Sequence, residues 1–189
     1  MDVSHETVVW LDRFVDFRKY TTYASGNANV MITPRNGFKM YIYDKLKYHE
    51  NGNHYKVYLK EDIPEKYHIK HNKRTPPIIL ICEPGWTSIT NRNGIEWFRK
   101  DNKYWLIGTH GYSPFERDMN PAFYAYGPAF RTGYNKTCIE TVDIYSLMCH
   151  ILDISPRQND GDFDRVKDLL KEFKDSQKLP KTRSLTKCF

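Results

Sequence analysis

The sequence predicts an α/β domain with some antiparallel strand pairing, and three observations point to this class. Residues 78–82 and 122–126 are short apolar runs bounded by proline or glycine, and they predict strands buried on both faces. Residues 54–63 alternate apolar and polar side chains, which predicts a half-buried strand that ends before Pro64. Residues 38–47 and 141–151 place apolar side chains at helical spacing. Strands and helices that alternate in this way favour a layered architecture.

Two further β-rich runs precede these elements. Residues 8–15 and the apolar centre Val30–Ile32 predict strands. The second strand is followed by Pro34–Gly37, a turn signal that separates it from the helix over 38–47. In that helix the expected core side chains are Met40, Ile42 or Tyr43, and Leu46.

The helix over 141–151 is expected to turn its apolar side chains to the core, with Thr141 or Asp143 as a cap. These core side chains are Val142, Tyr145, Leu147, Met148 and Ile151. Residues 163–173 predict a second, more charged helix, and residues 174–189 a solvated tail. Between the two buried strands, residues 86–120 have little periodicity and predict a long loop, of a length that is usually functional or disordered.

The composition excludes several classes of protein. With 40% hydrophobic and 28% charged residues, the chain is too apolar for disorder, and it has no apolar run long enough to cross a membrane. The formal charge of +6 is modest for 189 residues and forms no basic stripe, so no nucleic-acid partner is expected. The four cysteines form no C-x-x-C pair, which disfavours a zinc knuckle and leaves the disulfide pairing open; they are Cys82, Cys138, Cys149 and Cys188.

His110 is the candidate for metal binding, because it lies in the glycine-rich segment Gly108–Tyr112, where a ligand has room to approach the imidazole. A zinc ion takes about four ligands, so taken alone an ordinary loop histidine is the favoured interpretation. His68 and His71 fall in a polar connection, and His150 lies within the helix over 141–151, where we expect packing. No G-x-S-x-G motif, phosphate-binding glycine loop or activated cysteine is present, so the sequence shows no catalytic nucleophile.

A series of segments, in order and with plausible spacing, carries a resemblance to a known family. The segments are Val57–Pro64, His71-Asn72, Arg74, Pro77–Leu80, Gly85–Thr87, Gly108–Tyr112, Met119–Phe123, Tyr126–Phe130, Val142–Tyr145 and Leu147–Leu152. Over roughly residues 1–170 the chain resembles the C-terminal part of the catalytic domain of the ectonucleotide pyrophosphatase/phosphodiesterase family, above all its members four and five. That family has an alkaline-phosphatase-like α/β/α sandwich. The resemblance therefore implies a catalytic-domain part over 1–170 and a polar tail over 171–189.

The resemblance also implies chemistry. The family's last zinc ligand falls on His110, one of several that hold two zinc ions, and a threonine attacks phosphorus before water hydrolyses the covalent intermediate. In the family this threonine and the other ligands, an Asp, an Asp-x-x-x-His and an Asp-His pair, come earlier in the domain. Met1–Glu6 resembles the segment that follows the Asp-His pair. We therefore expect this chain to lack the nucleophile and most metal ligands and to be inactive alone, whether as a fragment, a truncated gene model or a degenerate paralogue.

By the same resemblance the complete enzyme would take a nucleotide or another phosphodiester small molecule and would act outside the cell or at its surface. The chain itself contains no membrane tether. Asn135-Lys136-Thr137 is then a glycosylation site. The chain departs from the family pattern at Ser113-Pro114, where the family often has Asp-Asn. The alternative is a non-catalytic paralogue that binds a partner or ligand through the loop over 86–120.

Overall fold

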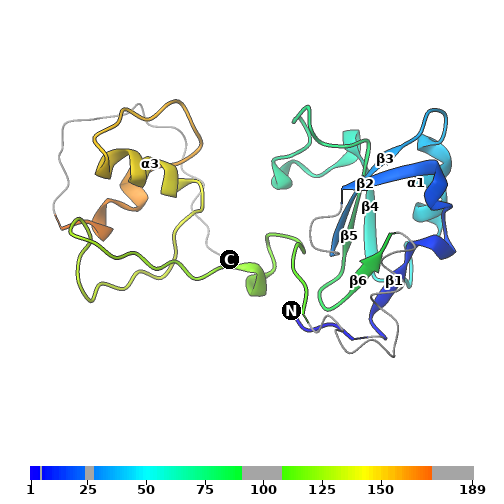
Figure 1. Cartoon of the computed structure of the whole chain (residues 1–189), viewed down its shortest axis with the longest axis horizontal. Coiled ribbons are helices and arrows are strands. Elements are labelled where there is room, and N and C mark those ends of the chain that lie inside the picture. Colours follow the sequence, from blue (N-terminus) through cyan, green and yellow to red (C-terminus); the bar gives the residue numbers. More distant parts are fainter. Residues whose placement is uncertain (5, 24–27, 91–107, 172–189) are drawn as a thin grey trace. The chain divides into compact units, whose positions relative to one another are not determined.

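The computed structural model describes residues 1–4, 6–23, 28–90 and 108–171. The chain divides into two units, Met1–Pro121 (unit 1) and Ala122–Phe189 (unit 2). All described strands belong to unit 1, and the helix α3 (Asp143–Ile151) belongs to unit 2 (Figure 1). The α/β class predicted from the sequence is confirmed.

An antiparallel sheet of four strands, in the order β2-β3-β5-β4, forms the centre of unit 1. The strands are β2 (Tyr20–Tyr23), β3 (Asn29–Pro34), β4 (Tyr55–Leu59) and β5 (Ile78–Cys82). The register places Leu80 of β5 between Val30 and Val57, and all three side chains are buried. The strands predicted over 78–82 and around 30–32 are therefore confirmed, and the strand predicted over 54–63 exists but ends at Leu59.

Helix α1 (Lys39–Tyr48) connects β3 to β4 and confirms the helix predicted over 38–47. Its buried residues are Ile42 and Leu46, whereas Met40, which we expected in the core, is half exposed. The Tyr55 hydroxyl on β4 donates a hydrogen bond of 2.6 Å to the Leu46 carbonyl. This bond satisfies a polar group in the core and ties the helix to the sheet.

A second, parallel pair of strands comes from segments far apart in the sequence. β1 (Val8–Trp10) pairs with β6 (Thr87–Ile89), with Val8 opposite Thr87. The strand predicted over 8–15 is thus confirmed only at its beginning, since a 3-10 turn with a buried Leu11 follows it. The prediction that 86–120 is a loop throughout is wrong for β6, because a short strand depends on its distant partner; residues 91–107 lie outside the described part.

Short 3-10 turns complete the described structure. They are Leu11–Arg13, Phe17–Lys19, Lys60–Asp62, Glu65–Tyr67, Arg117–Met119, Phe163–Arg165 and Lys167–Leu169.

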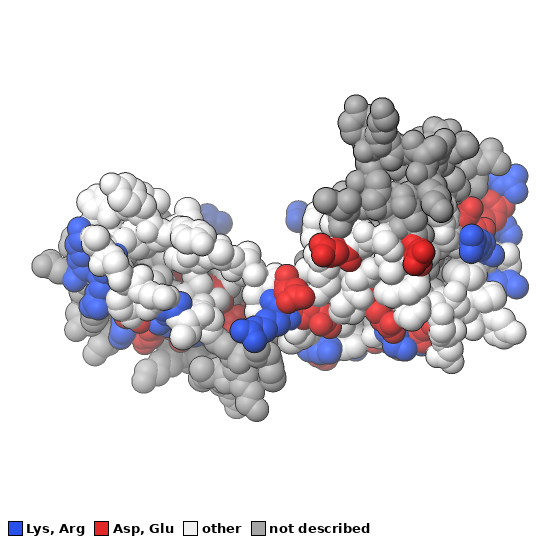
Figure 2. Space-filling view, turned by 90° about the horizontal axis from the view of Figure 1, so that it is seen from below, with Lys and Arg blue, Asp and Glu red and all other residues white. Residues whose placement is uncertain are grey.

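Among the described residues on the face of the molecule in Figure 2, basic and acidic residues are interspersed.

Unit 2 has a small core in which Leu147 of α3 packs with Val166 and Leu170. The helix predicted over 141–151 is confirmed, but the prediction of its buried side is wrong. Of the apolar residues expected in the core, only Leu147 is buried; the exposed ones are Val142, Tyr145, Met148 and Ile151. The buried side instead carries Asp143, Ser146, Leu147 and Cys149.

Two further predictions in unit 2 are wrong. Residues 122–126 form no strand, and Tyr124 and Tyr126 are almost fully exposed. A strand needs a neighbour for its backbone hydrogen bonds, and the described part of unit 2 offers only the isolated bridge between Phe130 and Leu170. The helix predicted over 163–173 is replaced by 3-10 turns up to Leu169, and residues 172–173 lie outside the described part. With these turns in place of a helix, Val166 and Leu170 pack against Leu147.

Candidate functional site

The segment Gly108–Tyr112, which we call the His110 loop, is paired with the first two residues of the chain. Gly108 forms an antiparallel bridge with Asp2. The Thr109 N–H donates to the Met1 carbonyl at 2.9 Å, and the Met1 ammonium donates to the Thr109 carbonyl at 3.0 Å. Backbone bonds on both sides of Thr109 therefore fix the position from which His110 projects.

The far end of the His110 loop is anchored in the core of unit 1. Gly111 has φ of +95°, a backbone angle that favours glycine, and its carbonyl accepts a 2.8 Å hydrogen bond from Asn29 Nδ2. Tyr112 follows and belongs to the core cluster that contains β3, β4 and β5 side chains. Burial raises the pKa of Tyr112 to about 12, so its hydroxyl stays protonated at neutral pH.

The His110 side chain is exposed although its neighbours Thr109 and Tyr112 are buried. Side chains alternate between two faces along extended backbone, so Thr109 points inward and His110 outward. The positive φ of Gly111 then interrupts this alternation before the buried Tyr112. A rigid backbone thus presents an accessible imidazole, which is the arrangement that a metal ligand or a general acid–base group requires.

A turn after β5 supports the same region. Gly85 has φ of +82°, and a Cβ built on it would lie 3.9 Å from the Asp2 carbonyl oxygen, so this turn lies against the N-terminal segment. The next residue, Trp86, stacks on His54, with ring centroids 3.9 Å apart and planes at 9°. His54 Nδ1 lies 2.9 Å from Glu83 Oε2. No sequence pattern indicates this cluster. The register Tyr55↔Cys82 makes it possible by placing His54 and Glu83 at the same end of two paired strands.

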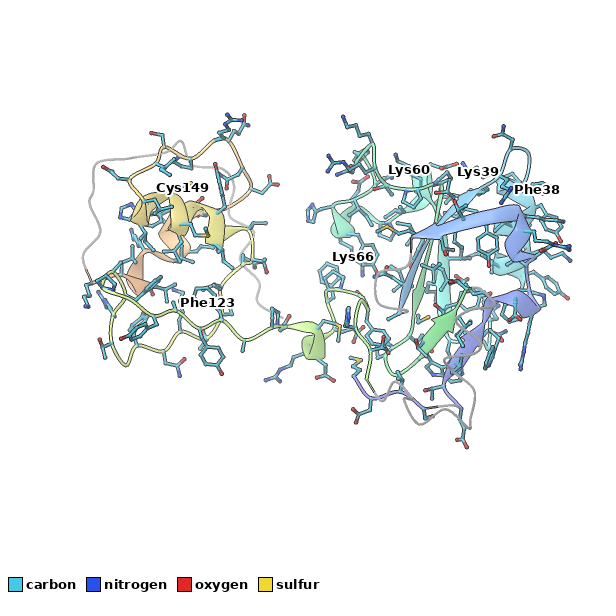
Figure 3. The ribbon with its side chains drawn as sticks, viewed as in Figure 1. Phe38, Lys39, Lys60, Lys66, Phe123 and Cys149 are labelled. Carbon is cyan, nitrogen blue, oxygen red and sulfur yellow. The ribbon has the colours of Figure 1, made fainter. Side chains whose placement is uncertain are left out.

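A cation–aromatic group forms where the 3-10 turn Glu65–Tyr67 meets the chain just beyond the His110 loop. Lys66 Nζ lies 4.7 Å from the ring centroid of Phe115 and 5.3 Å from that of Tyr67 (Lys66 is labelled in Figure 3). The Tyr67 and Phe115 rings are 6.0 Å apart. No periodic pattern in the sequence connects these residues, so only the fold brings them together.

The other histidines considered for metal binding have different surroundings. His71 Nε2 lies 3.1 Å from Glu65 Oε2, and His68 is in a left-handed conformation with φ of 55°. His150 stacks on Phe163, with centroids 4.3 Å apart. Across residues 1–4, 6–23, 28–90 and 108–171, no group of three or more His, Cys, Asp or Glu side chains could hold a metal ion. A zinc site on His110 therefore requires ligands from outside this part of the chain.

The cysteines of the described part have two states. Cys138 is disulfide-bonded, whereas Cys82 and Cys149 are buried thiols that form no disulfide. Burial raises the pKa of the Cys82 thiol to about 12, so this thiol is not an activated nucleophile. Asn135, the predicted glycosylation site, is exposed on the segment that leads to Cys138. No helix in the described part of the chain has the length and apolarity of a membrane span.

Comparisons with known proteins place the chain in a family. The family model of type I phosphodiesterase/nucleotide pyrophosphatase matches residues 1–113. Bovine bis(5'-adenosyl)-triphosphatase ENPP4 is 39% identical over 167 residues, which are 88% of this chain and 34% of the relative. Human ectonucleotide pyrophosphatase/phosphodiesterase family member 5 is 36% identical over 168 residues, or 88% of this chain and 32% of the relative.

Solved structures of the same family also match this chain. The structure of human ENPP5 matches with a TM-score of 0.76 at 35% identity, and the match covers 91% of this chain and 43% of the other. An inactive variant of murine ENPP5 in complex with AMP matches with the same TM-score of 0.76, over 90% of this chain and 42% of the other. These matches confirm the alkaline-phosphatase-like fold predicted from the resemblance.

The chain spans about a third of the length of these curated relatives, 34% and 32%. The family model nevertheless matches more than half of the chain, residues 1–113 of 189, and the identity to members four and five extends beyond it. The chain therefore belongs to the type I phosphodiesterase/nucleotide pyrophosphatase family.

Proposed function

We propose that this chain is the C-terminal part of the catalytic domain of a zinc-dependent nucleotide pyrophosphatase/phosphodiesterase, and that His110 is one of its zinc ligands. The complete enzyme would hydrolyse phosphodiester or pyrophosphate bonds of a nucleotide or similar small molecule. Family membership supports this activity, as do a relative named bis(5'-adenosyl)-triphosphatase and the AMP held by the murine ENPP5 structure.

The observation that carries the proposal is the pairing of Met1 and Asp2 with the His110 loop. By the family resemblance, the segment that begins at Met1 follows an Asp-His pair of metal ligands. Each residue of extended backbone advances by only about 3.3 Å, so ligands just upstream of Met1 would lie near Thr109 and its neighbour His110. A catalytic zinc ion commonly takes three protein ligands and keeps one position open, so one histidine and an Asp-His pair are a chemically suitable set.

Among the described residues, no group of three or more His, Cys, Asp or Glu side chains could complete such a site around His110. The proposal therefore predicts that the 189-residue chain by itself does not hydrolyse a nitrophenyl nucleotide ester, and hydrolysis by the purified chain would contradict it. The attacking threonine and the residues that select the substrate would likewise come from the part of the domain that the chain does not cover.

The proposed location of the complete protein is outside the cell or at its surface. Two observations support it. Cys138 is disulfide-bonded, and such bonds persist mainly in oxidising compartments. Asn135 is exposed, as a glycosylated asparagine must be.

One observation favours the alternative, a non-catalytic paralogue that acts by binding. Where the family often has Asp-Asn, this chain has Ser113 and Pro114. The Ser113 hydroxyl accepts a hydrogen bond from the Phe115 N–H at 3.4 Å, which closes a local turn. Metal-ligating histidines are commonly oriented by a carboxylate, so the loss of an Asp at this place would weaken a zinc site.

A chimera of bovine ENPP4 that carries this chain in place of its own matching stretch distinguishes the two functions. We expect it to hydrolyse bis(5'-adenosyl) triphosphate. His110→Ala should lower its kcat/KM by more than about 100-fold, because loss of a group that merely hydrogen-bonds to a metal ligand already lowers activity by ~10–100-fold. His71→Ala is the matched control, because His71 is also an exposed histidine of unit 1. A folded chimera that shows no hydrolysis would favour the non-catalytic alternative, and equal activity of the two variants would exclude His110 as a ligand.

A further inference from the structure

Helix α3 exposes an apolar surface that the sequence predicts to be core. We define the α3 apolar face as Tyr145, Met148, Ile151 and Leu152, whose side chains are 42%, 54%, 38% and 62% exposed. These residues are three or four positions apart along the chain, or adjacent as a pair, so they share one side of the helix. Soluble proteins rarely leave such a face to water, and a contiguous apolar patch commonly marks an interface.

The opposite side of α3 is held in place by a polar contact as well as by packing. Asp143 is fully buried, and its carboxylate accepts hydrogen bonds from the Arg165 guanidinium and from the Asp162 N–H at 2.8 Å. Leu147 packs against Val166 and Leu170. Because this side is engaged, the helix cannot rotate to bury the α3 apolar face within its own unit without breaking a buried ion pair.

The same unit exposes a second apolar segment. The exposed side chains are Phe123, Tyr124 and Tyr126, at 39%, 91% and 101%, and residues 122–126 form no strand. Figure 3 labels Phe123 in this segment and Cys149 in α3. An apolar run flanked by Pro121 and Gly127 has the composition of a buried strand. Unit 2 thus displays a helix face and a strand-like segment that are both exposed.

We propose that the α3 apolar face is the contact surface for a type I phosphodiesterase polypeptide that supplies the part of the domain this chain does not cover. Domains of this layered class bury helix faces against a sheet, and all described strands of this chain belong to unit 1. The match to the human ENPP5 structure covers 91% of this chain but only 43% of the ENPP5 chain. The remainder of such a polypeptide, more than half of its length, is therefore an occupant of sufficient size.

This inference rests on the family membership that underlies the proposed function, but it involves no metal and no hydrolysis. The test is co-expression of the full 189-residue chain with the part of bovine ENPP4 that precedes its matching stretch, followed by sedimentation of the purified complex in EDTA. We expect a one-to-one complex. Met148→Glu should weaken it by at least about tenfold, as loss of a central apolar contact does. Because EDTA removes any zinc, failure of the metal proposal leaves this result unchanged.

The matched control is Tyr48→Glu, since Tyr48 is 82% exposed on helix α1 of unit 1 and should not affect the complex. Oxidative footprinting of Met148 in the unaltered chain is a second readout that does not depend on whether the variant folds, and we expect protection only in the complex. Absence of the complex would overturn the proposal. Self-association that Met148→Glu abolishes would also overturn it, because the face would then bind a second copy of the chain. Protection of Met148 in the chain alone would overturn it as well, because another part of the same chain would then cover the face.

Discussion

Replacement of Arg165 by alanine should selectively destabilise unit 2. The Arg165 guanidinium is bound to the Asp143 carboxylate, with Nε 2.9 Å from Oδ2, and its terminal nitrogen binds the other oxygen. The pKa of Arg165 is raised by this hydrogen bonding, so its guanidinium stays charged at neutral pH. Asp143 has no exposed surface, and without Arg165 its charge would stay buried and lose its counter-ion.

The magnitude follows from the contacts. Arg165→Ala removes two hydrogen bonds to a charged group, each worth roughly 1.5–3 kcal/mol, and removal of one partner of a buried pair costs about 3–5 kcal/mol. The Arg165 side chain is 27% exposed, so water can reach the vacated position, and we expect a loss of ~3 kcal/mol. The backbone N–H groups of Asp162 and Glu140 still contact the carboxylate and prevent a larger loss.

Native-state hydrogen exchange measures this loss locally, because amides of unit 1 and unit 2 report separately. We expect faster exchange in α3, at Leu147 for example, and unchanged exchange at Val57 in β4. Asp143→Asn with Arg165→Ala is the matched control, since the double variant leaves no buried charge and should recover part of the stability. A change below about 1 kcal/mol in α3 would refute the assignment of Asp143 and Arg165 as the contact that orients this helix.

Two further predictions concern unit 1 and the glycosylation site. Burial by itself would raise the pKa of Glu50, but hydrogen bonds from Lys47 and the Val57 N–H outweigh it and lower the pKa below 4.5. A carboxyl pKa that is lower in the folded than in the unfolded chain stabilises the fold at pH values above the unfolded-chain pKa. Glu50→Gln should therefore lower the free energy of unfolding by roughly 1.5–3 kcal/mol at pH 7 and by progressively less below pH 4.5. Denaturant unfolding at each pH measures this loss, and an equal loss at pH 7 and pH 3 would contradict the prediction. Expressed through a secretory pathway, the chain should carry one N-linked glycan that Asn135→Gln removes, and mass spectrometry that finds Asn135 unmodified would argue against the proposed location.

The sequence by itself determined the elements that depend on local pattern. Residues 78–82 are continuously apolar, and residues 55–59 alternate, so β5 and β4 follow from their own side chains. Helix α1 and the turn at Gly37, with φ of +83°, follow in the same way. The exposed position of His110 next to the buried Tyr112 fits the glycine-rich motif, whereas its role as a ligand stays a prediction because its partners are not among the described residues.

Only the tertiary structure decided which distant segments meet. The pairing of β1 with β6, and of Met1 with Thr109, depends on backbone groups that carry no sequence signal. The side on which α3 is buried was also undetermined by periodicity, because the apolar stripe would suit any core. Within unit 2 the buried Asp143–Arg165 pair decided it, because a buried charge must be paired with a counter-charge.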